Sequence, residues 1–127
     1  MKKILIIDND PLTRASLAQT LLQKEYRVFH AKDGEQGLEE VRKNQPDLII
    51  CDLLSPKMSG LELRNEILVD PRTKNIPIIF LSENPSPDGL PPATPLAEPE
   101  YLTKPVDGEK LARLVQQRLK GRPRRSR

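Results

Sequence analysis

The sequence predicts a doubly wound α/β domain, in which a five-stranded parallel sheet is covered by helices on both faces. Two observations predict this class. Short runs of Ile, Leu, Val and Phe without alternating polar residues are typical of strands buried on both faces, and they occur at residues 4–7, 28–29, 48–51, 76–81 and, in minimal form, 101–102. The stretches between them have helical spacing, and parallel strands need such crossover connections.

The expected helices begin at recognisable caps. Asp10-Pro11 predicts the start of a first helix that ends near Lys24, with its apolar face made by Ala15, Ala18, Leu21 and Leu22. Asp33-Gly34-Glu35-Gln36 and Ser59-Gly60-Leu61-Glu62 both match the capping box and open the second and third helices. The last helix has Asp107 as its cap, Gly121 just past its end, and an apolar face of Leu111, Leu114, Val115 and Leu119.

One crossover helix is missing from this pattern. Residues 85–99 contain six prolines, at positions 85, 87, 91, 92, 95 and 99. Each proline removes a backbone donor and disfavours the helical conformation of the residue before it. We therefore expect an irregular, extended loop in place of the fourth helix, anchored on the sheet by Leu90 and Leu96.

Composition limits the domain count and the function classes. The 127 residues suffice for one core, which we place at residues 1–120. That body holds 17 Lys and Arg against 18 Asp and Glu, so the net charge of +3 comes from residues 121–127, a basic tail or the start of a linker with four arginines. This distribution disfavours nucleic acid as a partner.

Apolar runs and cysteine content point to a cytoplasmic domain. No apolar run exceeds four residues, against about 20 for a membrane span, and the start of the chain does not match a secretory signal. The single cysteine, Cys51, can form neither an internal disulfide nor a cysteine-based zinc site, and we expect it to be buried. The single histidine, His30, is expected at the surface and disfavours a hydrolytic triad.

Polar residues at the strand ends form the candidate site. Asp8, Asp52, Ser82 and Lys104 stand at the carboxyl ends of the first, third, fourth and fifth strands, where ligands bind in open α/β sheets. Two carboxylates, a hydroxyl and an ammonium at one edge can hold a divalent cation and a phosphoryl group. In the competing interpretation the two acids merely end their strands. Asp10 is interpreted as a helix cap.

The motifs around these residues resemble those of the response regulator receiver domain, the phosphoacceptor module of two-component signalling. The resemblance covers residues 2–120 and depends on four segments, at residues 3–11, at 46–52 with Pro56 and Gly60 downstream, at 76–82 and at 101–105. It implies the flavodoxin-like receiver fold. It also implies that Asp52 accepts phosphate from a histidine kinase or phosphotransfer protein.

The resemblance further implies the other site residues. Asp8, Asn9, Asp52 and the carbonyl of Leu54 would hold Mg²⁺, while Lys104 and Ser82 would bind phosphoryl oxygens. Ser82 and Tyr101 would be the switch residues. Tyr101 fits equally well as a core aromatic with its hydroxyl at the surface.

Three features depart from the family pattern. Asn9 replaces the second of two adjacent acids, so we expect Mg²⁺ to bind weakly. Glu83 follows Ser82, where a small residue is usual, and residues 85–99 replace a helix of the usual output face.

The favoured function is a phosphoacceptor switch of reduced competence, and the alternative is a pseudo-receiver that works by docking alone. A phosphohydrolase is disfavoured because no separate general base is visible. The kinase, the output, homodimer formation and whether the domain stands alone are left open.

Overall fold

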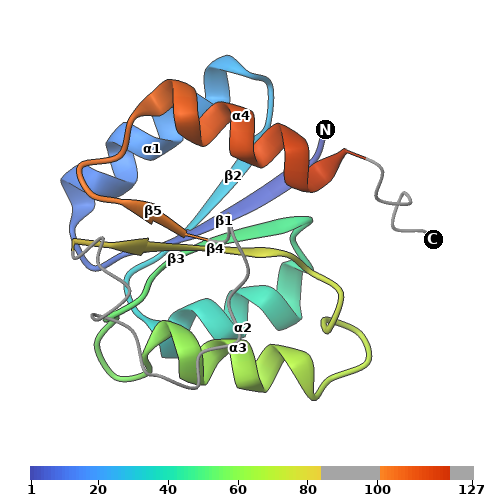
Figure 1. Ribbon diagram of the computed structural model, residues 1–127. Helices are drawn as coiled ribbons and strands as arrows, with labels where there is room; N and C mark the ends of the chain where they lie inside the picture. Colours follow the sequence, from blue (N-terminus) through green and yellow to red (C-terminus); the bar gives the residue numbers. More distant parts are fainter. Residues whose placement is uncertain (84–100, 121–127) are drawn as a thin grey trace.

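A single sheet of five parallel strands forms the centre of the molecule, in the order β2-β1-β3-β4-β5 (Figure 1). The computed structural model describes residues 1–83 and 101–120, apart from the side chain of Tyr101. The strands are β1 (Lys3–Ile7), β2 (Arg27–Ala31), β3 (Leu48–Asp52), β4 (Ile78–Ser82) and β5 (Tyr101–Thr103). The helices are α1 (Pro11–Gln23), α2 (Gly34–Asn44), α3 (Gly60–Leu68) and α4 (Gly108–Leu119).

Helices cover both faces of the sheet, α1 and α4 on one side and α2 and α3 on the other (Figure 1). This confirms the doubly wound class. The loop predicted for residues 85–99, with its anchors Leu90 and Leu96, and the tail at 121–127 lie outside the described residues. No helix in the described ranges is long and apolar enough to cross a bilayer.

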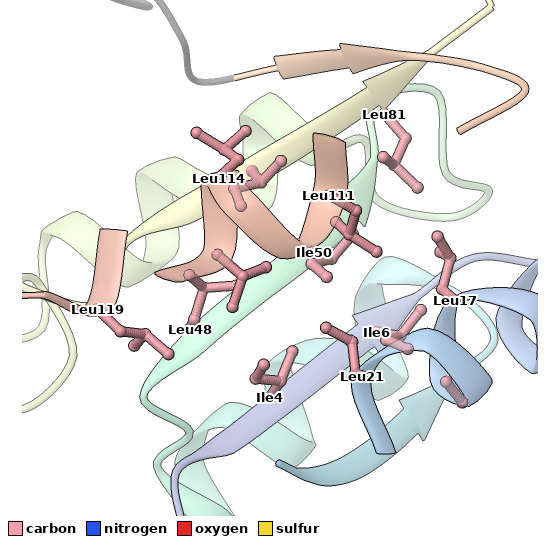
Figure 2. Packing of buried hydrophobic residues seen from close by; sticks show 13 residues of the cluster. Ile4, Ile6, Leu17, Leu21, Leu48, Ile50, Leu81, Leu111, Leu114 and Leu119 are labelled. Atoms are coloured by element: carbon pink, nitrogen blue, oxygen red, sulfur yellow. The ribbon is translucent and has the colours of Figure 1, made fainter. Parts of the chain in front are cut away.

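Two apolar clusters hold the helices to the sheet. In the first, Leu17 and Leu21 of α1 and Leu111 and Leu114 of α4 pack on side chains from the strands, among them Ile6 (Figure 2). The second joins α2 and α3 to the opposite face and contains the fully buried Phe80. Because the strands contribute to both clusters, their apolar runs do not alternate with polar residues.

The apolar face predicted for α1 was partly wrong. Ala18 and Leu21 are buried as expected, but Ala15 and Leu22 are exposed, and Leu17 is buried instead. Successive residues turn by about 100° around a helix, so Leu22 lies a quarter turn beyond Leu21 and misses the sheet. The sequence of α1 has apolar residues nearly all round, so periodicity alone could not choose the buried side.

The predicted helix starts are confirmed, with one difference. Asp10, Asp33, Ser59 and Asp107 are the N-caps, and each side chain accepts a hydrogen bond from a backbone N–H of the first turn. Only Ser59 forms the complete capping box. At α2 the Gln36 side chain accepts from the backbone N–H of Lys32 at 2.8 Å, one residue before the cap.

Candidate functional site

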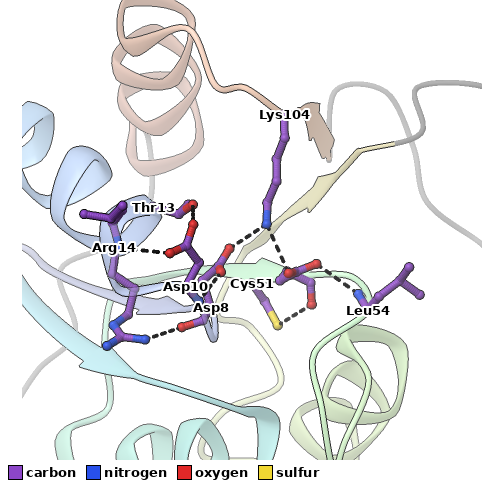
Figure 3. Close-up of polar contacts among 9 residues, drawn as sticks. Asp8, Asp10, Thr13, Arg14, Cys51, Leu54 and Lys104 are labelled. Carbon is purple, nitrogen blue, oxygen red and sulfur yellow. Dashed lines mark hydrogen bonds and ion pairs between the residues drawn. The ribbon is translucent and has the colours of Figure 1, made fainter.

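The carboxyl ends of four neighbouring strands carry the polar residues predicted from the sequence. Asp8 directly follows β1, Asp52 and Ser82 are the last residues of β3 and β4, and Lys104 directly follows β5. Because β1, β3, β4 and β5 are adjacent in the sheet, these residues share one edge. Figure 3 shows the Lys104 side chain reaching across this edge toward Asp8.

Lys104 bridges the two aspartates. Its Nζ lies 2.8 Å from Oδ2 of Asp8 and 3.1 Å from Oδ2 of Asp52. Burial by itself lowers the pKa of Lys104, but the hydrogen bonds and charges of Asp8 and Asp52 outweigh it, so the pKa is raised above its ordinary value. One ammonium thus neutralises one of two negative charges, and the three groups together carry a net charge of −1.

Asp8 is fixed in position by the start of α1. Its side chain has no exposed surface, and Oδ1 accepts a hydrogen bond from the backbone N–H of Asp10 at 2.9 Å. The carbonyl of Asp8 accepts from the Arg14 guanidinium. Its Oδ2 faces the Lys104 ammonium and has no other donor among the described residues. Asp8 is therefore a rigid, buried carboxylate with one oxygen directed at a cation.

The Asp52 side chain is more exposed to solvent than that of Asp8. Its Oδ1 accepts a hydrogen bond from the backbone N–H of Leu54 at 3.1 Å, its Oδ2 faces Lys104, and its side chain is 16% exposed. The Leu54 side chain points away from the carboxylates and is 82% exposed (Figure 3). Of the two carboxylates, Asp52 is the one that solvent and other molecules reach.

Ser82 and Asn9 stand at the same edge of the sheet. The Ser82 side chain is buried, and its carbonyl accepts a hydrogen bond from the backbone N–H of Lys104 at 2.8 Å, which joins the ends of β4 and β5. Asn9 is exposed, and no hydrogen bond between described residues joins its side chain to Asp8 or Asp52. Glu83, directly after Ser82, is also exposed.

Asp10 and Cys51 behave as the sequence predicted. Both carboxylate oxygens of Asp10 accept hydrogen bonds from α1, from the Leu12 backbone N–H at 3.1 Å and the Thr13 hydroxyl at 2.8 Å. The Thr13 hydroxyl, with smaller help from the backbone, lowers the pKa of Asp10. Cys51 is buried, and burial together with the nearby aspartates raises the pKa of its thiol far above the ordinary range, which excludes a thiolate nucleophile.

Arg14 is a site residue that sequence reasoning missed. Its guanidinium binds the Asp8 carbonyl from one helical turn into α1. An arginine on a helix facing solvent carries no sequence signal for such a contact.

His30 is exposed, as predicted. The pKa of its imidazole is lowered, first because part of the ring is shielded from water and second because the Arg14 guanidinium is nearby.

The donor set at Asp8 and Asp52 fits a magnesium ion. Both carboxylates already contact one cation, so their Oδ2 atoms can be no farther apart than the two ion-pair distances combined. Magnesium takes one or two protein carboxylates and completes its six ligands with neutral oxygens and water. Within the described ranges no group of three or more acidic, histidine or cysteine side chains is placed to hold a metal. Asp8 and Asp52 are therefore the two carboxylates that this edge offers to a cation.

The comparisons with known proteins agree with this fold. The family model of the response regulator receiver domain matches residues 4–116, and the chain belongs to that family. It is therefore a signalling module of two-component systems, a class that interacts with histidine kinases and phosphotransfer proteins.

Individual relatives show the same domain in different settings. A probable cyclic di-GMP phosphodiesterase of Vibrio cholerae is 37% identical over 103 residues, 81% of this chain, and the chain spans only 23% of its length. A putative response regulator from Chloroflexus aurantiacus has a TM-score of 0.84 at 30% identity, covering 93% of this chain and 97% of that one. The receiver domain of a sensor histidine kinase from Pseudomonas aeruginosa, solved with magnesium in its active site cleft, has a TM-score of 0.81 at 26% identity, with the same coverages of 93% and 97%.

Proposed function

We propose that this domain is a phosphoacceptor switch, in which Asp52 takes a phosphoryl group from a phosphohistidine of a histidine kinase or phosphotransfer protein. The observation that carries the proposal is the different exposure of the two carboxylates that share Lys104. Asp8 has no exposed surface, whereas the Asp52 side chain is 16% exposed. A donor protein can therefore present its phosphoryl group to Asp52 and not to Asp8.

The transfer exchanges one bond to phosphorus for another. A carboxylate oxygen of Asp52 bonds to phosphorus while the bond from phosphorus to the donor's imidazole nitrogen breaks, and the nitrogen keeps the electron pair. This brings negative charge toward negative charge, so cations have to offset the repulsion. The ammonium of Lys104, 3.1 Å from Asp52, is one such cation. It would form an ion pair with a phosphoryl oxygen once the phosphoryl group is on Asp52. The Ser82 hydroxyl would donate a hydrogen bond to another phosphoryl oxygen.

Asp8 and Asp52 are the carboxylates that we propose for Mg²⁺, with the Leu54 carbonyl and the Asn9 amide oxygen as neutral ligands. Bound there, the ion would supply the positive charge that Lys104 alone does not. Because Asp8 is fixed by the Asp10 N–H and by Arg14, it would hold its ligand oxygen in place without rearrangement. Asn9 leaves the set one charge short of the usual family site, which weakens the binding.

Ser82 and Tyr101 are proposed as the switch residues. Supporting this, the hydrogen bond from the Lys104 N–H to the Ser82 carbonyl joins the end of β4 to the end of β5, the strand that begins at Tyr101. A phosphoryl group that draws both the Ser82 hydroxyl and the Lys104 ammonium would pull on both strands at this link. The side chain of Tyr101 lies outside the described residues.

The donor protein is proposed to rest beside Lys104. A groove is lined there by Leu12, Thr13, Ser16 and Leu17 of α1 and by Lys104, Pro105 and Val106 after β5. Leu12 is 78% exposed, which gives a partner an apolar contact next to the reacting group. We place the domain in the cytoplasm, where such donors work, with no membrane partner and no nucleic-acid partner.

Intact-mass measurement tests the proposal. With acetyl phosphate and Mg²⁺ the protein should gain the mass of one phosphoryl group, and Asp52→Asn should remove that gain. Asp10→Asn is the matched control, because asparagine also caps helices and Asp10 is engaged by α1. If the folded protein gains no mass under forcing conditions, the pseudo-receiver is the better account, which the neutral Asn9 and the acidic Glu83 favour.

A further inference from the structure

The two edges of the sheet carry opposite charge. All five strands run in the same direction, so the last turns of the helices and the first residues of the strands meet at one edge. This amino edge is formed by residues 1–3, 24–27, 42–48, 69–77 and 117–120. Figure 1 shows the start of the chain and the end of α4 on the same side of the molecule.

The amino edge is strongly basic. Its five segments hold ten Lys and Arg against three Asp and Glu. Five of the cations are exposed and form no ion pair with another described residue, namely Lys24, Arg27, Lys43, Lys74 and Lys120. The four arginines of residues 121–127 follow Lys120 directly in the sequence and add to the same sign.

The opposite edge, which carries Asp8 and Asp52, is acidic. This carboxyl edge is formed by residues 8–13, 32–37, 52–62, 82–83 and 103–109, which hold nine Asp and Glu against three Lys. Six of the acids are exposed, namely Asp10, Glu35, Glu62, Glu83, Asp107 and Glu109. Acids at helix starts and bases at helix ends match the helix dipole, so helices that run the same way separate the charge of the whole domain.

We propose that copies of this chain associate head to tail, with the acidic carboxyl edge of one copy on the basic amino edge of the next. The same four helices begin at one edge and end at the other, so acids and cations recur at a similar lateral spacing on the two surfaces. Opposite charges attract across such a contact, and like charges oppose a contact between two identical edges. Because two different surfaces meet, the association is heterologous.

The association would cover the edge that carries Asp52. The Asp52 side chain is 16% exposed there, and a phosphodonor has to reach it from this side. A copy whose carboxyl edge lies on a neighbour would therefore accept phosphate more slowly than a free copy. This consequence rests on the proposed function, whereas the association itself does not.

Sedimentation equilibrium of the full chain, without metal or phosphodonor, tests the association. The weight-average mass should rise with protein concentration at about 10 mM salt, where charges act over about 30 Å. At about 150 mM salt the dissociation constant should be at least tenfold higher, because charges then act over only about 8 Å. A wild-type protein that stays monomeric at low salt would overturn the proposal, and binding of poly-glutamate to that monomer would assign the basic edge to an acidic partner instead.

Charge reversal at the two ends of the same helices identifies the surfaces. Lys43→Glu with Lys120→Glu weakens the amino edge at the ends of α2 and α4, and Glu35→Lys with Glu109→Lys weakens the carboxyl edge at their starts. Each double variant should associate at least tenfold more weakly than wild type. In an equimolar mixture, the intact carboxyl edge of the first variant meets the intact amino edge of the second, so pairs should form with the wild-type affinity.

The matched control reverses charges between the two edges. Glu39 and Arg113 are exposed within α2 and α4, and Glu39→Lys with Arg113→Glu should associate within about twofold of wild type. Thermal melts verify that each variant is folded. Folded edge variants that associate like wild type, a mixture that forms no pairs, or a control that loses association equally would each overturn the head-to-tail contact.

The covering of Asp52 has its own readout. The rate of phosphorylation per molecule by acetyl phosphate and Mg²⁺ should fall as the concentration of wild-type protein rises, and should stay constant for Lys43→Glu with Lys120→Glu. The same concentration dependence in both proteins would overturn the covering and leave the association standing. Absence of phosphorylation in every variant would remove the proposed function and leave the sedimentation result unaffected.

Discussion

The ammonium of Lys104 lies 2.8 Å from Oδ2 of Asp8, a carboxylate with no exposed surface. The pair joins the first strand of the chain to the last, across β3 and β4. A buried carboxylate needs a partner for its charge, and the partners of this one are the Lys104 ammonium and the Asp10 N–H. Stability and the proposed chemistry thus depend on the same ion pair.

This ion pair predicts a fall in stability at high pH. The pKa of Lys104 is raised by its two aspartates, so its contribution is fully present below the unfolded value of about 10.5 and is lost as the pH rises through the folded value. Lys104→Arg keeps its charge at these pH values, so its unfolding free energy should fall less between pH 9.5 and 11.5. Urea unfolding over this range measures the difference, and parallel curves would contradict the prediction.

The charge of the metal site can be restored at position 9. Asn9→Asp should tighten Mg²⁺ binding by about tenfold or more, a difference of ~1.4 kcal/mol, which is well within the energy of one added ion pair. Calorimetry on both proteins measures it. Asn9→Ala is the control, since it removes the amide without adding charge. Equal affinities in Asn9→Asp and wild type would mean that residue 9 does not face the metal.

Glu83 should slow phosphorylation through its charge. It is exposed directly after Ser82, so an incoming phosphoryl donor meets one more negative charge at the edge of the site. A unit charge acting on a dianion through solvent changes the free energy by about 0.5–1 kcal/mol, so Glu83→Gln should react with acetyl phosphate about two- to fivefold faster. The advantage should shrink as salt is added. A rate that does not depend on the substitution at low salt would show that Glu83 lies outside the path of the donor.

A close approach between α2 and the loop after β3 predicts a stability effect near the site. A Cβ on Gly34 would overlap the Met58 carbonyl, which belongs to the backbone and cannot swing aside. Gly34→Ala should therefore cost about 1–3 kcal/mol of unfolding free energy. Gly108→Ala is the control, because its Cβ would meet only the end of the Thr20 side chain at 3.1 Å. Equal urea midpoints for the two variants would argue against this packing.

The elements predictable from the sequence are those that local chemistry decides. The caps at Asp10 and Ser59 were predicted because each depends on residues within one helical turn. The position of Asp8, Asp52 and Lys104 at one edge of the sheet was predicted because the carboxyl ends of parallel strands lie at the same edge.

The elements that were wrong or missed depend on tertiary packing. Leu22 was placed on the buried face of α1, and only the sheet decides that Leu17 is buried instead. That one ammonium spans both aspartates depends on the reach of the Lys104 side chain from β5 to β1, which no spacing in the sequence encodes. The contact of Arg14 with the Asp8 carbonyl is likewise set by how α1 leaves its strand.

The proposed phosphoacceptor role of Asp52 is tested most directly by beryllium fluoride, which mimics a phosphoryl group on a carboxylate. With Mg²⁺ present, ¹⁹F NMR should show fluorine signals bound to the wild-type protein and none with Asp52→Asn. Bound signals that persist in Asp52→Asn, or a folded wild-type protein that forms no adduct at saturating Mg²⁺ and beryllium fluoride, would contradict it.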